Sequence, residues 1–175
     1  MRAFQNVAGF FFCFLPVIFF LTWAYPAYSQ EPLPVSEAFS TFFGAGFAPT
    51  PGSGQLDSDA WRATGFSDGN GTFGGNYTSG DFARGTHSGG TGTGGIYAFD
   101  VGGGNFILGV QPIGSDFTPG DFTLKMQNTT GGTVTDLKIS YRVWYYNDNN
   151  RANSLDFSYS PDDIAYTSVS GLSFT

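Results

Sequence analysis

The longest run of alternating apolar and polar side chains covers residues 134–146 and predicts the longest strand of the protein. Successive side chains of a strand point to opposite faces, so this strand has one apolar face and one mixed face. The apolar face holds Leu137, Ile139, Tyr141, Val143 and Tyr145. The mixed face holds Lys138, Ser140, Arg142, Trp144 and Tyr146. A second alternating run at 154–160 predicts an antiparallel partner, and 164–169 predicts a further short strand.

Shorter apolar runs predict the remaining strands. Residues 96–101 and 105–111 flank three consecutive glycines, which predicts a hairpin because glycine adopts turn conformations freely. In the run 122–127, Phe122, Leu124 and Met126 should face the core while the side chains between them face solvent. The glycine-rich segment 65–95 predicts long loops. Other short strands are expected at 35–47, which should contain a bend, and near 81–86. A further short strand is expected around Trp61, whose large ring should be buried in the core.

Composition narrows the fold class. Glycine accounts for 26 of the 175 residues, aromatic residues for 18% and charged residues for only 12%. So few charges are not typical of a protein built from long exposed helices, and so many aromatic rings are not typical of a disordered chain. Glycine turns and aromatic strands instead favour an all-β domain, and we expect an antiparallel β-sandwich.

The first 29 residues have the pattern of a secretory signal peptide. Arg2 precedes a long apolar run, and Ala27 and Ser29 are small residues at the positions before a cleavage site, which we place between Ser29 and Gln30. The alternative is an uncleaved membrane anchor, since the run is nearly long enough to span a bilayer. We expect a secreted or cell-surface protein that meets the membrane only through this segment, followed by a linker at 30–34 and the domain at 35–175.

Charge argues against one class of partner. Residues 30–175 carry six Lys and Arg against 14 Asp and Glu, which leaves a net charge of −8. The six basic residues are scattered along the sequence, whereas a nucleic-acid groove needs clustered positive charge. We therefore expect no nucleic acid among the partners.

The sequence lacks the motifs of the common enzymes. His87 is the only histidine, Cys13 the only cysteine, and no Gly-x-Ser-x-Gly elbow is present. The glycines at 90–95 match a dinucleotide motif formally, but the segment after them is strand-like where a helix is needed. The pair Asp57 and Asp59 lies in a predicted loop, without the apolar surroundings that would tune a catalytic acid. We expect a non-enzymatic protein.

Calcium is the one metal that the sequence favours. Hard oxygen ligands on loops suit this ion. The candidates are Asp148 in the Asn-rich segment 147–150 and the neighbouring pair Asp162 and Asp163. The alternative for 147–150 is a plain turn, because Asn and Asp tolerate left-handed backbone. No other cofactor is expected.

The mixed face of the 134–146 strand suggests a binding site. Trp144 and Tyr146 lie two residues apart on it, with Arg142 next to them. Aromatic rings at this spacing stack on sugar rings, and a guanidinium group donates to hydroxyl or carboxylate oxygens. The alternatives are a strand that is covered on both faces, or an aromatic pair that stabilises the sheet.

Several segments, in order, resemble a β-sandwich domain of bacterial secreted and cell-surface multidomain proteins. Such proteins often carry C-terminal sorting tags or appended modules, and the resemblance implies a jelly-roll, lectin-like fold without a defined activity. The family pattern continues into a later acidic strand that this sequence lacks, so we expect the domain to be truncated at its C-terminus. The matching segments are VSEAFSTFF (35–43), Trp61, DFARG (81–85), FTLKMQNTT (122–130), LKISYRVWYY (137–146) and RANSLDFSYSP (151–161).

These observations lead to one expected function and two alternatives. We expect a secreted, non-catalytic β-sandwich module that adheres to surfaces or contacts a polysaccharide or cell-surface glycan. The first alternative is the N-terminal accessory region of a longer secreted hydrolase. The second is a purely structural component of the cell surface.

Overall fold

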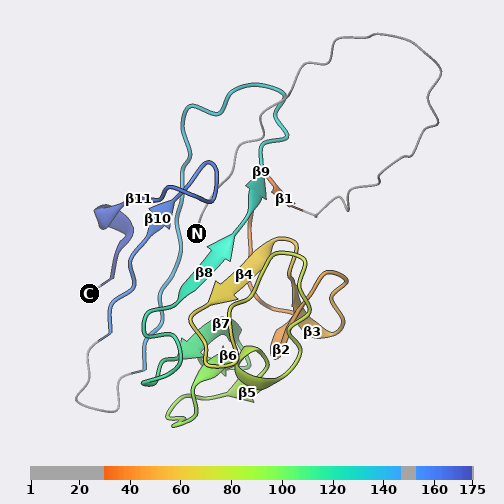
Figure 1. Ribbon diagram of the computed structural model, residues 1–175, viewed down its shortest axis with the longest axis vertical. Helices are drawn as coiled ribbons and strands as arrows, with labels where there is room; N and C mark the ends of the chain where they lie inside the picture. Colours follow the sequence, from red (N-terminus) through yellow and green to blue (C-terminus); the bar gives the residue numbers. More distant parts are fainter. Residues whose placement is uncertain (1–29, 147–152, 175) are drawn as a thin grey trace, which may run out of the picture.

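Short strands joined by glycine-rich loops make up the computed structural model, which describes residues 30–146 and 153–174 (Figure 1). Every regular element in these ranges is a strand or a short 3-10 turn, which confirms the predicted all-β class. The strands pair into four two-stranded sheets and one three-stranded sheet. These pairings do not by themselves make the two facing sheets of a sandwich. None of the described residues belongs to a helix with the length and apolar character needed to span a bilayer.

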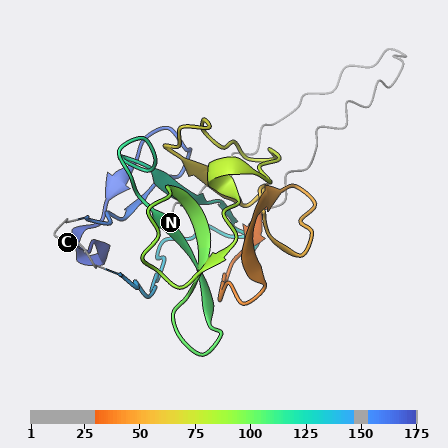
Figure 2. The ribbon, with the colours of Figure 1, turned by 90° about the horizontal axis from the view of Figure 1, so that it is seen from below.

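The predicted hairpin is confirmed. Strands β6 (Gly95–Asp100) and β7 (Phe106–Gln111) pair antiparallel, with Ile96 opposite Val110, and β5 (Thr86–His87) adds to β6 in parallel. The three connecting glycines, 102–104, all have positive φ angles, which side chains rarely tolerate. The hairpin tip projects from the rest of the protein (Figure 2).

The first long strand is shorter than expected, and a glycine in it allows a neighbouring segment to approach closely. Strand β2 (Phe42–Ala48) pairs in parallel with β3 (Gly54–Asp57). Next to Gly46, Phe47 exchanges two backbone hydrogen bonds with Tyr77, at 2.9 and 2.8 Å. A Cβ atom at Gly46 would lie 2.0 Å from the Tyr77 carbonyl oxygen, so only glycine allows this close approach.

Two further strand pairs lie within residues 30–127. Strand β4 (Trp61–Thr64) pairs antiparallel with β8 (Asp121–Leu124), and Trp61 is buried as predicted. Strand β1 (Glu31–Pro32) pairs in parallel with β9 (Met126–Gln127), so the segment that we expected to be a linker takes part in the fold. The alternation predicted for 122–127 is wrong at Thr123 and Lys125, which are buried as well.

The hydrophobic core lies entirely within residues 30–127, which we call the body. Twelve buried side chains from β2, β3, β4, β6, β8, β9, their loops and the 3-10 turn η1 (Gly80–Phe82) pack together there. They are Phe42, Phe47, Leu56, Ala60, Trp61, Ala63, Phe66, Phe82, Ile96, Ala98, Leu124 and Met126.

The C-terminal region, residues 128–146 and 153–174, is built differently. Only β10 (Ser158–Tyr159), β11 (Thr167–Ser168) and the 3-10 turn η2 (Ser170–Leu172) are regular within it. The predicted strand at 134–146 is wrong, because none of these residues pairs with another described strand. The β10–β11 pair lies on the side of the body away from β2 and β3 (Figures 1 and 2).

Candidate functional site

The predicted binding residues are exposed, although not for the predicted reason. Trp144 is 50% exposed and Tyr146 66% exposed, and Arg142 is exposed as well. Val143 and Tyr145 belong to the predicted inner face, but they are also exposed, Tyr145 by 74%. An unpaired segment has no sheet to cover its sides, so Val143 and Tyr145 are exposed together with Trp144 and Tyr146.

Two ring–ring contacts connect this segment to residues 153–174. The Tyr145 ring lies 5.4 Å from the ring of Phe174, centre to centre. The Tyr141 ring stacks on buried Phe157 at 5.9 Å, and the Tyr141 hydroxyl donates to the carbonyl oxygen of Leu172. Burial raises the pKa of Tyr141. Segment 134–146 is therefore held against residues 153–174 at Tyr141, while the rings of residues 144–146 remain exposed to solvent.

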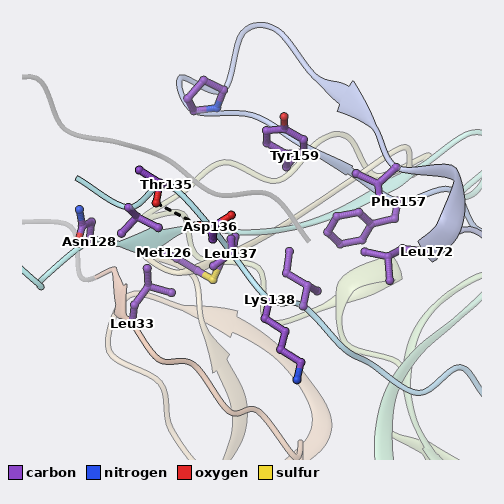
Figure 3. A pocket seen from close by; sticks show the side chains of 14 residues that line it. Leu33, Met126, Asn128, Thr135, Asp136, Leu137, Lys138, Phe157, Tyr159 and Leu172 are labelled. Carbon is purple, nitrogen blue, oxygen red and sulfur yellow. Dashed lines mark hydrogen bonds between the residues drawn. The ribbon is translucent and has the colours of Figure 1, made fainter. Parts of the chain in front are cut away.

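A cavity of about 630 Å³ lies between the body and the C-terminal region (Figure 3). Leu33 and Met126 form its wall on the body, residues 134–139 form a second wall, and Phe157 and Leu172 belong to a third. Its lining is mainly apolar, with polar groups such as Lys138 among the side chains. Sequence reasoning missed this cavity because its walls come from segments that are far apart in the chain.

Both carboxylates of the acidic pair proposed for calcium make hydrogen bonds or an ion pair with other residues of the protein. Asp162 accepts hydrogen bonds from the backbone of Ile164 and Ala165 and from the Ser160 hydroxyl, and these bonds lower its pKa. Asp163 forms a two-pronged ion pair with Arg62, with both N–O distances at 2.7 Å. Within the described ranges, no three His, Cys, Asp or Glu side chains gather as metal ligands would. Asp148 lies outside the described residues, as does Ser29 on one side of the predicted cleavage site.

A group of charges around Phe73 was not predicted. The Arg62 guanidinium lies 4.7 Å from the centre of the Phe73 ring, and the Lys125 ammonium lies 4.6 Å from it. Burial lowers the pKa of Lys125, although the carboxylates nearby, above all Asp59, oppose this shift. Burial likewise raises the pKa of Asp57. A cation over a ring face is attracted to the electrons of the ring, so Arg62 and Lys125 hold the glycine-rich loop at Phe73 against β4 and the end of β8.

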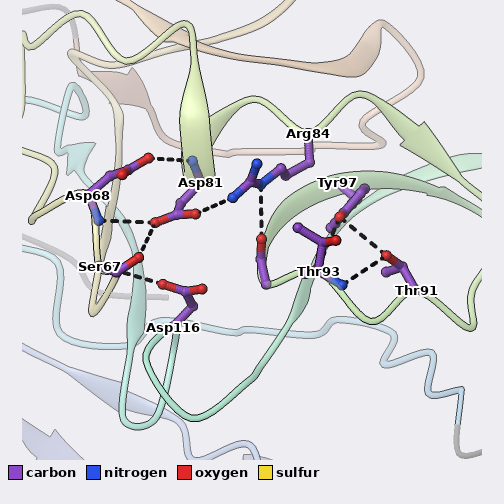
Figure 4. Close-up of polar contacts among 9 residues, drawn as sticks. Ser67, Asp68, Asp81, Arg84, Thr91, Thr93, Tyr97 and Asp116 are labelled. Atoms are coloured by element: carbon purple, nitrogen blue, oxygen red, sulfur yellow. Dashed lines mark hydrogen bonds and ion pairs between the residues drawn. The ribbon is translucent and has the colours of Figure 1, made fainter.

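A second polar network anchors the turn η1 (Figure 4). The Asp81 carboxylate is 2% exposed and accepts hydrogen bonds from the Ser67 hydroxyl, the Asp68 backbone and the Arg84 guanidinium. Burial raises the pKa of Asp81, but these three bonds outweigh it and hold that pKa below its usual value. Arg84 also donates to the Gly94 carbonyl oxygen at 2.9 Å. Strand β6 follows directly, so the glycines at 90–95 do not lead into a helix.

Comparisons with protein-family models, with curated proteins and with solved structures find no match to this chain. The assignment of a function therefore rests on the sequence and on the geometry of the described residues.

Proposed function

We propose that this chain is a secreted, non-catalytic binding module whose residues 144–146, the aromatic segment, contact carbohydrate. The observation that carries the proposal is the exposure of three consecutive rings, of which each is at least half exposed. Large aromatic side chains contribute strongly to stability when they are buried. A group of them on the surface is typical of a contact site.

The chemistry of the segment suits sugars. The faces of Trp144 and Tyr146 offer flat apolar area for the CH groups of a sugar ring. The Arg142 guanidinium, two residues before Trp144, can donate to hydroxyl or carboxylate oxygens. Arg142 is exposed, and within the described residues no hydrogen bond or ion pair joins its side chain to another residue.

Two further features support the location and the fold that we propose for this module. The apolar run and small residues of 1–29 support export. The antiparallel pairs β4–β8 and β6–β7 support a sandwich of the jelly-roll type, as in the bacterial surface domains that the sequence resembles.

A binding comparison between two aromatic variants tests the function. Wild-type protein on a glycan array should identify a ligand, and Trp144→Ala should then weaken binding at least tenfold without lowering the melting temperature. The matched control is Phe43→Ala, because Phe43 is 43% exposed and lies on β2, on the other side of the protein. Absence of any glycan ligand, or equal losses in both variants, would overturn the proposal.

A further inference from the structure

Segment 134–146 has the side-chain pattern of a strand but pairs with none of the strands in the described residues. No backbone hydrogen bond connects it to another part of the described chain, and most of its residues are exposed. An unpaired extended segment presents a row of backbone donors and acceptors, which is a template for pairing with a further strand.

The sequence of this segment is complementary to itself. When two copies run antiparallel with Ile139 opposite Ile139, Asp136 of one copy lies opposite Arg142 of the other, and this pair occurs twice. In the same register Leu137 lies opposite Tyr141. Opposite charges and apolar partners at directly facing positions each stabilise an antiparallel pair.

We propose that a second copy of this chain pairs with residues 134–144 as an antiparallel strand, centred on Ile139. Residues that face each other in this register come from the same face of the strand. The apolar side chains of the two copies, which include Ile139, Tyr141 and Val143, therefore form one continuous apolar surface. That surface extends the contact that Tyr141 already makes with Phe157.

Charge selects this register over its neighbours. A shift of two residues in one direction places Lys138 opposite Arg142, and a shift of two in the other direction places Lys138 opposite Lys138. Like charges that face each other directly destabilise a strand pair. A shift of one residue places apolar Ile139 opposite Lys138 or Ser140, depending on its direction, and mixes the two faces.

Cysteine cross-linking tests the register. In the full chain with Cys13→Ser, Ile139→Cys places two thiols on directly opposite residues, whose Cα atoms lie about 4.5–5.5 Å apart, within reach of a disulfide. The matched control is Ser140→Cys, whose two copies would lie about 8 Å apart, beyond that reach. We expect a disulfide-linked dimer at position 139 in mild oxidant and at least tenfold less at position 140. Equal cross-linking at both positions, or none at 139, would overturn the proposal.

A charge exchange tests the pairing without introducing a thiol. Asp136→Arg and Arg142→Asp should each weaken self-association at least tenfold in sedimentation velocity, because each variant brings like charges together at both pairs. The double variant should restore association close to that of wild type, because the opposite charges face each other again. A monomeric wild-type protein at high micromolar concentration, or a double variant that is weaker than either single variant, would refute the dimer.

Discussion

The body and the C-terminal region contain similar kinds of side chain but use them differently. In the body, Phe42, Phe47 and Ile96 are at most 2% exposed and pack between paired strands. In the C-terminal region, Phe157 is the one apolar side chain that is buried, within the described residues. The difference shows that aromatic content alone does not build a core, because most of the buried rings lie where paired strands and the turns between them meet.

Truncation of a core ring gives the largest expected effect. Phe42→Ala should lower the free energy of unfolding by about 3–5 kcal/mol, since it leaves a cavity among well-packed neighbours. The counterpart in the C-terminal region is Leu137→Ala, which should cost less than about 1 kcal/mol because Leu137 is 41% exposed. Denaturant titration of both variants measures the contrast, and equal losses would show that the two regions form a single cooperative core.

The buried carboxylate of the body gives the next largest effect. Asp81→Asn should cost about 2–3 kcal/mol at neutral pH, because it weakens hydrogen bonds that involve a charged group. The folded state lowers the pKa of Asp81, so its stabilising contribution is present above the ordinary Asp pKa and is lost as the pH falls through the lowered value. The difference in stability between wild type and variant should therefore shrink in acid. A difference that is constant from pH 7 to pH 2 would contradict this role.

The ion pair between the two regions gives a smaller effect. Asp163→Asn removes the charge that meets Arg62, and asparagine tolerates the positive φ of 61° at this position. The loss of a two-pronged, half-buried pair should cost about 1–2 kcal/mol. We expect faster proteolysis of residues 153–174, whereas exposed Asp156→Asn should change little. Unchanged proteolysis in Asp163→Asn would show that another contact joins the regions.

The smallest expected effect is a gain. The Thr123 hydroxyl is fully buried, and no hydrogen-bond partner for it lies within the described residues. Thr123→Val keeps the shape and removes the unpaired group, so it should stabilise the body by about 1 kcal/mol. Exposed Thr135→Val, in the C-terminal region, should leave the melting temperature within error. A destabilised Thr123→Val would show that the hydroxyl is paired.

Local patterns predicted the parts of the fold that depend on local sequence. The β6–β7 hairpin followed from two apolar runs and three glycines, and burial of Trp61 followed from its size. The strand at 134–146 could not be judged in this way, because alternation describes the shape of a strand but not the partner that it needs. The buried position of Lys125 was missed for a similar reason, since it depends on Phe73, 52 residues away in the chain.

The candidate site was predicted in its residues but not in its surroundings. Exposure of Trp144 and Tyr146 was expected from alternation, yet it results from the lack of pairing along their segment. The cavity beside that segment is lined by residues as far apart in the sequence as Leu33 and Leu172, and no local sequence pattern predicts that such residues lie close together.

The projecting hairpin tip offers a practical attachment point. A Cβ atom placed at Gly102, Gly103 or Gly104 would meet no atom within 4 Å apart from its neighbours in the chain. Exposed loop tips with small residues accept inserted sequence more readily than other sites. An affinity tag or a fluorophore carrier inserted between Gly103 and Gly104 would therefore extend into solvent, away from the packed core. Labelled protein of this kind would allow binding to be followed while residues 134–146 keep their native sequence.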